Sequence, residues 1–496
     1  MTRSAFVIGF VILGLLTFTL VACVQETSGT DTAYDIHIKE PNVPDWHKRA
    51  NIYEVNLRHY TPEGTFSAFA GHLPRLKRMG VDILWLMPIH PVSEEKRKGE
   101  LGSPYAVGDY KAVNPDYGTM EDFKMLLDSI HALGMYCILD WVPNHTGWDN
   151  PWITEHPDWY SQDADGNIID PINQETGESW GWTDVADLNY DNPDMRLGMI
   201  DAMRFWTQEV GVDGFRVDVA HSVPVDFWVQ CSDSLYADGP VFLLAEAEVP
   251  ALRNTGSFVM DYGWEMHHLL NEIARSQGAN RGTSASLQQG NLVETEEEEA
   301  ELKTALDIDL LLAKKATEYD KGYAMHFTSN HDENSWAGTE FERMGDGHKA
   351  FAVLTATFDG MPLIYTGMES AMDKQLAFFT KDEVPWGDFE YENFYRTLFH
   401  LKHINQALWN GKHGGELVKI QSGNDQNIYA FMREKNRDRV VVVINLSADT
   451  QAYHLSGDQH WGVYSDAFNP ADGLVSVGSE FSGELGPWEY MVLHRE

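Results

Sequence analysis

Between about residue 50 and residue 365, short apolar runs alternate along the chain with stretches that have the spacing of amphipathic helices. Continuous apolar runs are typical of parallel strands buried on both faces. Eight strands are predicted, over 51–57, 83–88, 136–140, 214–217, 241–244, 257–260, 325–328 and 362–365. Helices are predicted between them, among others over 66–79 and 120–133. Strands and helices in this alternation predict a (β/α)8 TIM barrel, an α/β fold.

Two intervals depart from the alternation. Residues 146–182 are rich in Asp, Gly, Pro, Asn and Trp and have no helical period. They are too many for an ordinary loop, so we predict a small inserted domain after strand 3. Beyond residue 410 a period-two pattern predicts a C-terminal antiparallel β-domain, interpreted as a β-sandwich over 411–496. Its clearest strands are 427–432, 439–445 and 489–493, and the catalytic barrel is assigned to 46–410.

The N-terminus has the pattern of a secretory signal. Arg3 precedes an apolar run that ends in Leu20-Val21-Ala22-Cys23, which is typical of a signal peptide, here 1–22. This ending resembles a bacterial lipobox, so Cys23 is expected to carry lipid and the polar residues 23–45 to form a tether. A transmembrane anchor is the weaker alternative, because the run is short for a span. The expected location is exported and lipid-anchored in a bacterial membrane, periplasmic or at the cell surface.

Charge and cysteine content narrow the class of protein. The chain has 76 acidic and 36 basic residues, a formal net charge of -40. Nucleic-acid phosphates would be repelled, so no nucleic-acid partner is expected. The acidic run 294–301 is expected to be a solvated helix or loop. Cys137 and Cys231 lie in apolar-patterned elements and are expected to be free thiols rather than a disulfide framework.

One predicted strand carries a charged pair at its end. In Gly214-Phe215-Arg216-Val217-Asp218, Arg216 and Asp218 are two residues apart and therefore share one face of the strand. A cation beside a carboxylate keeps it ionised and orients it, as a nucleophilic aspartate requires. An isolated pair of this kind is more often a structural ion pair. The residues at the other strand ends are therefore needed to distinguish a catalytic pair from a structural one.

Polar residues gather at the ends of four predicted strands, where barrel enzymes keep their chemistry. The residues are Asp140, Asn144, His145, Arg216, Asp218, Glu246, Asn330, His331 and Asp332. Helix capping would explain one such ending. Four endings with this many carboxyl groups instead indicate an active site.

The order of these motifs along the chain resembles that of the α-amylase family of glycoside hydrolases. The motifs are D-x-x-x-N-H, then G-F-R-x-D, then a strand-ending glutamate and then N-H-D. The likeness covers about residues 48–496. Supporting stretches are 103–105, 109–110, 187–189 and 360–367. The resemblance implies a barrel with an inserted domain and a terminal β-domain. It also implies an enzyme that cleaves α-glucosidic bonds by a two-step retaining mechanism.

The resemblance further implies roles for individual residues. Asp218 would be the nucleophile, Glu246 the general acid and base, and Asp332 the carboxylate that holds sugar hydroxyls. Residues implied to bind substrate or organise the site are Tyr105, Asp140, His145, Arg216 and His331. A retaining glycosidase needs two carboxyl groups about 5 Å apart in different protonation states. We therefore expect Asp218 to be ionised beside Arg216 and Glu246 to be protonated near neutral pH.

Many members of this family carry a calcium ion between the barrel and the inserted domain, and Asn144 and Asp187 match two of its ligands. The histidine that usually contributes comes four residues after the nucleophile, whereas His221 comes three after Asp218. Two oxygen ligands are too few for an ion that takes about six to eight. The sequence therefore leaves calcium open, and no organic cofactor is expected.

The linkage preference is also left open. Val219 after the nucleophile, and Asp187-Leu188-Asn189, resemble members that cleave α-1,6 bonds in short oligosaccharides, although Ala186 stands where those have proline. The expected function is α-amylase-like hydrolysis of starch, maltodextrins or related α-glucans. Alternatives are an oligo-1,6-glucosidase, an α-glucosidase, a sucrose- or trehalose-acting relative or a transglycosylase. A glucan-binding lipoprotein without activity is disfavoured, because all three carboxyl residues are present. The sequence does not indicate an oligomeric state.

Overall fold

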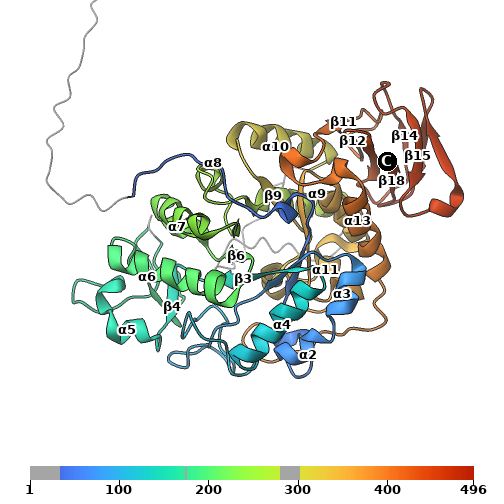
Figure 1. Ribbon diagram of the computed structural model, residues 1–496. Helices are drawn as coiled ribbons and strands as arrows, with labels where there is room; N and C mark the ends of the chain where they lie inside the picture. The colour runs from blue at the N-terminus through green and yellow to red at the C-terminus, as the bar shows by residue number, and fades with distance from the viewer. Residues whose placement is uncertain (1–33, 174–175, 280–301, 496) are drawn as a thin grey trace, which may run out of the picture. The chain divides into compact units, whose positions relative to one another are not determined.

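The computed structural model describes residues 34–173, 176–279 and 302–495 (Figure 1). By its internal contacts the chain divides into Met1–Ala33 and Tyr34–Glu496. The predicted signal peptide 1–22, Cys23 and the acidic run 294–301 lie outside the described residues. Within the described ranges, no helix has the length and apolar character needed to cross a membrane.

Eight parallel strands close into a barrel in the spatial order β1-β10-β9-β8-β7-β6-β3-β2. Their bounds are β1 Ile52–Val55, β2 Ile83–Leu86, β3 Tyr136–Trp141, β6 Gly214–Val217, β7 Phe242–Ala245, β8 Met260–Tyr262, β9 Tyr323–His326 and β10 Gly360–Tyr365. Nearly all of their residues are buried, as expected for strands with helices outside and side chains inside the barrel. The predicted barrel is confirmed.

One strand begins later than its apolar run. β8 starts at Met260 instead of residue 257. The preceding residues close the end of the helix α8, Pro250–Asn254, where the Phe258 N–H donates to the carbonyl of Leu252 at 3.2 Å. The backbone of Val259 already bonds to the neighbouring strands, through its N–H to the Leu243 carbonyl at 3.3 Å and its carbonyl to the Tyr323 N–H at 3.2 Å.

The helices connect the strands and differ from prediction at one place. Their bounds are α1 Leu57–Tyr60, α2 Phe66–Ala70, α3 Leu73–Met79, α4 Met120–Ala132, α6 Pro193–Arg204, α7 Val225–Asp238, α9 Trp264–Ser276, α10 Ala305–Glu318, α11 Glu340–Met344, α12 His348–Thr357 and α13 Glu392–Ile404. The single helix predicted over 66–79 is two helices, α2 and α3. Gly71 ends the first, and Pro74 stands in the first turn of the second, where its missing N–H costs no helical hydrogen bond.

A small insertion leaves the barrel after β3, as predicted. Its two strands, β4 His145–Gly147 and β5 Val185–Asp187, pair antiparallel. The insertion also contains a five-residue helix, α5 Pro151–Glu155, whose first turn is capped by the Asn150 side chain. A helix of little more than one turn leaves no apolar period in the sequence, so it was not predicted.

The C-terminal part is an antiparallel β-domain, as predicted. One sheet has the order β11-β12-β13-β18-β15-β16, and β14 pairs with β17 in a second. Their bounds are β11 Leu417–Lys419, β12 Ile428–Lys435, β13 Asp438–Asn445, β14 Gln451–His454, β15 Gly462–Asp466, β16 Leu474–Val477, β17 Ser482–Leu485 and β18 Tyr490–Arg495. Tyr453 and Leu485 of the small sheet share an apolar cluster with Val441 and Leu493 of the large one. The two sheets therefore enclose a common core.

The two cysteines in the described residues also agree with prediction. Cys137 and Cys231 are buried and free. Each lies in a core element, β3 and α7 respectively. They act as small apolar core residues.

Candidate active site

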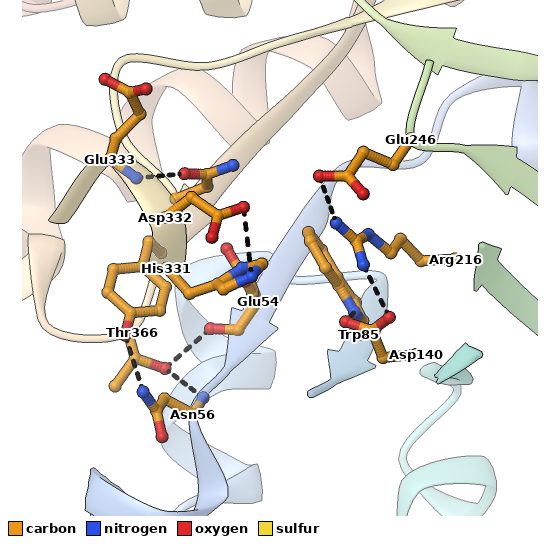
Figure 2. Close-up of polar contacts among 12 residues, drawn as sticks. Glu54, Asn56, Trp85, Asp140, Arg216, Glu246, His331, Asp332, Glu333 and Thr366 are labelled. Atoms are coloured by element: carbon orange, nitrogen blue, oxygen red, sulfur yellow. Dashed lines mark hydrogen bonds and ion pairs between the residues drawn. The ribbon is translucent and has the colours of Figure 1, made fainter. Parts of the chain in front are cut away.

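Arg216 lies at the centre of three carboxyl groups. Its Nη1 is 2.8 Å from Asp140 Oδ1 and 2.9 Å from Asp218 Oδ1. Its Nη2 is 2.8 Å from Glu246 Oε1, and Figure 2 shows the guanidinium between Glu246 and Asp140. Its Nε donates to the Tyr262 hydroxyl at 3.1 Å. The Arg216 side chain is fully buried, so these bonds are not weakened by competing water.

Strand register brings this cluster together. β3, β6 and β7 are neighbours in the barrel, and Asp140 on β3 stands opposite Arg216 on β6. Val217 stands opposite Ala245 at the end of β7, which places the next residue, Glu246, at the same edge. Parallel strands end at one face of a barrel. The sequence signal of polar residues at strand ends was therefore a valid guide to proximity.

A second group forms around His331. Its Nδ1 is 2.5 Å from Glu54 Oε1, and its Nε2 is 3.3 Å from Asp332 Oδ2 (Figure 2). The Tyr105 hydroxyl lies 2.7 Å from His331 Nε2 and donates to Asp140 Oδ2 at 3.0 Å. Tyr105 thereby connects the His331 group to the Arg216 group.

The surroundings of Asp218 shift its pKa in a direction that the sequence did not indicate. Burial and the adjacent Glu246 carboxylate raise the pKa of Asp218 well above its ordinary value, although Arg216 acts in the opposite direction. Burial likewise raises the pKa of Asp140. One guanidinium shared among three carboxyl groups cannot hold all of them ionised in a buried site. The pKa of Asp218 is therefore shifted upward, whereas the Arg216–Asp218 pair considered alone would shift it downward.

Glu246 is held through both of its oxygens. Oε1 contacts Arg216, and Oε2 accepts a hydrogen bond from the Val219 N–H at 2.7 Å. Val219 has φ 34° and ψ 45°, in the left-handed region that a β-branched residue rarely adopts. The turn in the chain directly after Asp218 therefore aims a backbone donor at Glu246.

The two histidines of the predicted site carry different charges. Against the effect of burial, the charges of Asp332 and Glu54 raise the pKa of His331 to about 9. Burial instead lowers the pKa of His145 to about 4. His331 is therefore a cation at neutral pH, and His145 is neutral.

Aromatic rings lead away from the carboxyl cluster toward solvent. The Tyr105 and Phe378 rings are nearly parallel, with an interplanar angle of 7° and centroids 6.2 Å apart. Phe378 in turn contacts Trp336 at 5.2 Å, and Trp336 is 51% exposed. A row of aromatic faces of this kind can pack against the apolar faces of sugar rings.

A second aromatic pair lies in the insertion. Trp180 and Trp182 are 6.2 Å apart with an interplanar angle of 24°. Trp182 also meets the His145 ring at 5.8 Å. The sequence did not single out these residues or Trp336, because 16 tryptophans are spread along the chain without a distinguishing spacing.

The two residues matched to a calcium site, Asn144 and Asp187, lie near one another, since the Leu188 N–H donates to the Asn144 carbonyl at 3.1 Å. Asn144 Nδ2, however, lies 3.2 Å from His145 Nδ1. In the three described ranges, no group of three or more His, Cys, Asp or Glu side chains could hold a metal ion. Asn144 and Asp187 would supply two of the roughly six to eight oxygens that calcium takes, so calcium binding stays a prediction.

The structure thus unites most of the predicted site and adds one residue. The residues brought together are Tyr105, Asp140, Arg216, Asp218, Glu246, His331 and Asp332. In the described part of the chain, His145 forms no hydrogen bond or ion pair with their carboxyl groups. Sequence reasoning missed Glu54, which it treated only as a strand residue. An acid within the apolar run Ile52-Tyr53-Glu54-Val55 was the available signal, because buried acids are rare unless paired.

Known proteins with a similar sequence or fold match this chain over most of its length. Residues 28–469 match the family described as the alpha amylase catalytic domain. An alpha-amylase of Haloarcula japonica is 25% identical over 460 residues, covering 88% of this chain and 62% of the relative. The crystal structure of a maltogenic alpha-amylase from Thermotoga neapolitana has a TM-score of 0.76 and 26% identity, covering 90% of this chain and 98% of that one.

A further relative is matched over a shorter segment. An alpha-1,4-glucan:maltose-1-phosphate maltosyltransferase of Rhodospirillum rubrum is 34% identical over 217 residues, covering 39% of this chain and 31% of the relative. This chain therefore spans less than two thirds of the length of both curated relatives named here.

Proposed function

Since this chain belongs to the alpha-amylase family of glycoside hydrolases, we propose that it hydrolyses α-glucosidic bonds in starch, maltodextrins or related α-glucans with retention of configuration. The observation that carries the proposal is that Arg216 contacts both Asp218 and Glu246. A retaining glycosidase needs two carboxyl groups beside one sugar ring. Contact with the same guanidinium holds these two carboxyl groups in one place at the barrel mouth, which supports this pairing.

In the first step Asp218 attacks the anomeric carbon of the sugar, and its Oδ forms the new C–O bond. Glu246 gives its proton to the glycosidic oxygen as the bond from that oxygen to the anomeric carbon breaks. The leaving chain departs with a free hydroxyl group. The sugar remains as an ester of Asp218, with its configuration inverted once.

In the second step Glu246, now a carboxylate, takes a proton from a water molecule. The water oxygen attacks the anomeric carbon, and the bond to Asp218 breaks. The configuration is inverted a second time, so the product is the α-anomer. Glu246 is protonated again and Asp218 is again a free carboxylate.

The mechanism requires a proton on Glu246 and none on Asp218. Glu246 and Asp218 both contact Arg216, and burial together with the Glu246 charge raises the pKa of Asp218, which favours a proton shared between the two carboxyl groups. The reactive form is the one in which that proton is on Glu246 and Asp218 is ionised. To donate it, Glu246 must turn one oxygen from Arg216 or Val219 toward the leaving oxygen.

The remaining groups would bind the sugar. Asp332 is the most open of the acids, with 36% of its side chain exposed, and would accept hydrogen bonds from sugar hydroxyls. His331 would donate from Nε2. The exposed Trp336 and Trp180 would pack against glucose units farther along the chain, which favours an oligomeric or polymeric substrate.

The experiment that tests this function is activity on soluble starch, maltotriose and isomaltose, with the products separated by size. Release of shorter maltooligosaccharides from starch would support α-1,4 hydrolysis. Cleavage of isomaltose alone would move the assignment to an oligo-1,6-glucosidase. No cleavage of any of the three would contradict the proposal.

Transfer of the sugar is a second candidate, supported by the similarity to a maltosyltransferase. In that case an acceptor hydroxyl replaces water in the second step, and Glu246 deprotonates it. Adding a large excess of a maltooligosaccharide acceptor distinguishes the two. Products longer than the donor would favour transfer, and unchanged product sizes would favour hydrolysis.

Export and lipid anchoring are also part of the proposal. They rest on Leu20-Val21-Ala22-Cys23 closing the apolar run of a predicted signal peptide. Replacing the cysteine, Cys23→Ser, should leave the protein unprocessed or release it from the membrane fraction. A Cys23→Ser protein that fractionates and migrates like the wild type would contradict this assignment.

A further inference from the structure

We propose that Glu54 is a positioning residue of this active site, which fixes the orientation and charge of His331 without touching the substrate. The inference rests on the proposed function, in which His331 donates a hydrogen bond to the sugar. It concerns a residue on β1, away from the strand ends that carry the family motifs.

The Glu54 carboxylate pairs with His331. Oε1 is 2.5 Å from His331 Nδ1, and the side chain is fully buried. Oε2 is also buried and has no hydrogen-bond partner among the described residues. A buried carboxylate is costly unless it is paired. Its single partner therefore accounts for its presence in an otherwise apolar strand.

The backbone holds Glu54 in place. Its carbonyl accepts hydrogen bonds from the Thr366 N–H at 3.0 Å and from the Thr366 hydroxyl at 2.7 Å (Figure 2). On either side it stands opposite Tyr365 of β10 and Trp85 of β2. Because Glu54 is held between two barrel strands, its carboxylate can fix the orientation of the His331 ring.

Charged, polar and aromatic groups from several parts of the barrel lie around the His331 ring. Glu54 comes from β1, Asp332 follows in the chain, and Tyr105 lies 2.7 Å away. Trp85 of β2 meets the ring edge-on at 5.9 Å. Arg216 of β6 and Asp140 of β3 lie beyond these, joined to the ring through Tyr105.

The balance of these groups makes His331 an imidazolium. Two carboxylates, Glu54 and Asp332, outweigh burial and the repulsion from Arg216, and the pKa of His331 is raised to about 9. With both nitrogens protonated, Nδ1–H donates to Glu54, and Nε2–H is directed toward the Tyr105 hydroxyl and Asp332, where a sugar hydroxyl can share it. Without Glu54, a neutral ring could place its one proton on either nitrogen.

The test is Glu54→Gln, which keeps the shape and an acceptor oxygen but removes the charge. In wild-type protein labelled with ¹⁵N-histidine, we expect a strongly deshielded Nδ1 proton for His331, with a titration midpoint near 9. In Glu54→Gln we expect that signal to be lost and the midpoint to fall toward about 6.5. We expect kcat/KM to fall about ten- to a hundred-fold at neutral pH, and its alkaline limb to move to lower pH.

The matched control is Glu369→Gln. Glu369 is also fully buried and paired with a cation, Arg75, at 2.8 Å, but it does not contact His331. We expect Glu369→Gln to lower the melting temperature without changing the His331 resonance or the alkaline limb. Should Glu54→Gln fail to fold, Glu54→Asp is measured in the same way, with a weakened but detectable pairing expected.

An unchanged His331 signal and an unchanged alkaline limb in the Glu54 variant would overturn the inference. The same shift in the Glu369 control would also overturn it, because a general loss of stability would then be the cause. The resonance is measured without substrate. It therefore tests the Glu54–His331 pairing even if starch, maltotriose and isomaltose were not cleaved and the proposed function failed.

Discussion

The Val219 N–H donates a 2.7 Å hydrogen bond to Glu246 Oε2 while Val219 holds a left-handed backbone, with φ 34°. The residue after the proposed nucleophile is thus bonded to the proposed acid. A β-branched residue in this conformation stores on the order of 1–3 kcal/mol of strain, and such strain is found at functional sites. The backbone conformation of Val219 therefore helps to fix the position of the Glu246 carboxyl group.

The strain can be measured by replacement with glycine. Val219→Gly loses the burial of a nearly buried side chain, worth about 1.5–3 kcal/mol, but glycine adopts a positive φ without penalty. Val217→Gly, in the extended strand β6, loses similar burial without this relief. We expect Val217→Gly to be more destabilising by about 1–3 kcal/mol in denaturant unfolding. Equal losses in the two variants would show that Val219 is not strained.

The assignment of nucleophile and acid predicts two distinct defects. Asp218→Asn should lower kcat by about 10⁴-fold or more, because an amide cannot form the glycosyl ester. Glu246→Gln should lower kcat on natural glucans by about 10²- to 10⁴-fold. It should retain the first step with α-glucosyl fluoride, whose leaving group needs no proton.

The control for these variants is Glu248→Gln. Glu248 is two residues after Glu246 but pairs with Lys315 at 2.9 Å and should leave kcat unchanged. Equal loss of activity by Glu246→Gln on glucans and on the fluoride would argue against a role as general acid.

The raised pKa of Asp218 predicts the position of the acid limb. Asp218 must lose its proton to attack, so kcat/KM should rise with pH as Asp218 ionises. Because burial and the Glu246 charge raise that pKa, the limb should lie above about 3.9, the value of a free aspartate. A pH profile of kcat/KM checks this, and an acid limb at or below that value would contradict the account.

Glu333 gives a separate prediction on stability. Although burial acts against it, pairing with His267 and Arg343 lowers the pKa of Glu333 to about 2. A depressed carboxyl pKa stabilises the folded state above the unfolded pKa, near 4.3, and this contribution is lost as pH falls through the folded pKa. The difference corresponds to roughly 3 kcal/mol at neutral pH.

We therefore expect Glu333→Gln to lower the free energy of unfolding by about 2–3 kcal/mol at neutral pH, and by progressively less toward pH 2. The exposed Glu390 offers a control, since Glu390→Gln should change little at any pH. A Glu333→Gln deficit that does not shrink on acidification would contradict the linkage.

Much of the fold and of the site was predictable because both depend on short-range patterns. Buried parallel strands leave apolar runs, and side chains at their ends meet at one barrel face. Asp140, Arg216, Asp218 and Glu246 come together for this reason, on three neighbouring strands.

What the sequence did not predict depends on contacts across the barrel. Glu54 meets His331 although β1 and β9 are separated by β10, and no spacing along the chain indicates that approach. Asp218 directly follows the strand that carries Arg216, but the other two carboxyl partners of Arg216, Asp140 and Glu246, come from β3 and from the end of β7. The pKa of Asp218 depends on all of them, so the Arg216–Asp218 pair alone does not give the direction of its shift.

The most direct test of the central claim, that Asp218 is a nucleophile in a retaining mechanism, is proton NMR of the first product formed from a maltooligosaccharide. Two inversions at the anomeric carbon predict that the α-anomer is released first and that the β-anomer grows only by later mutarotation. If the β-anomer is released first, the enzyme inverts, and Asp218 does not form the covalent intermediate.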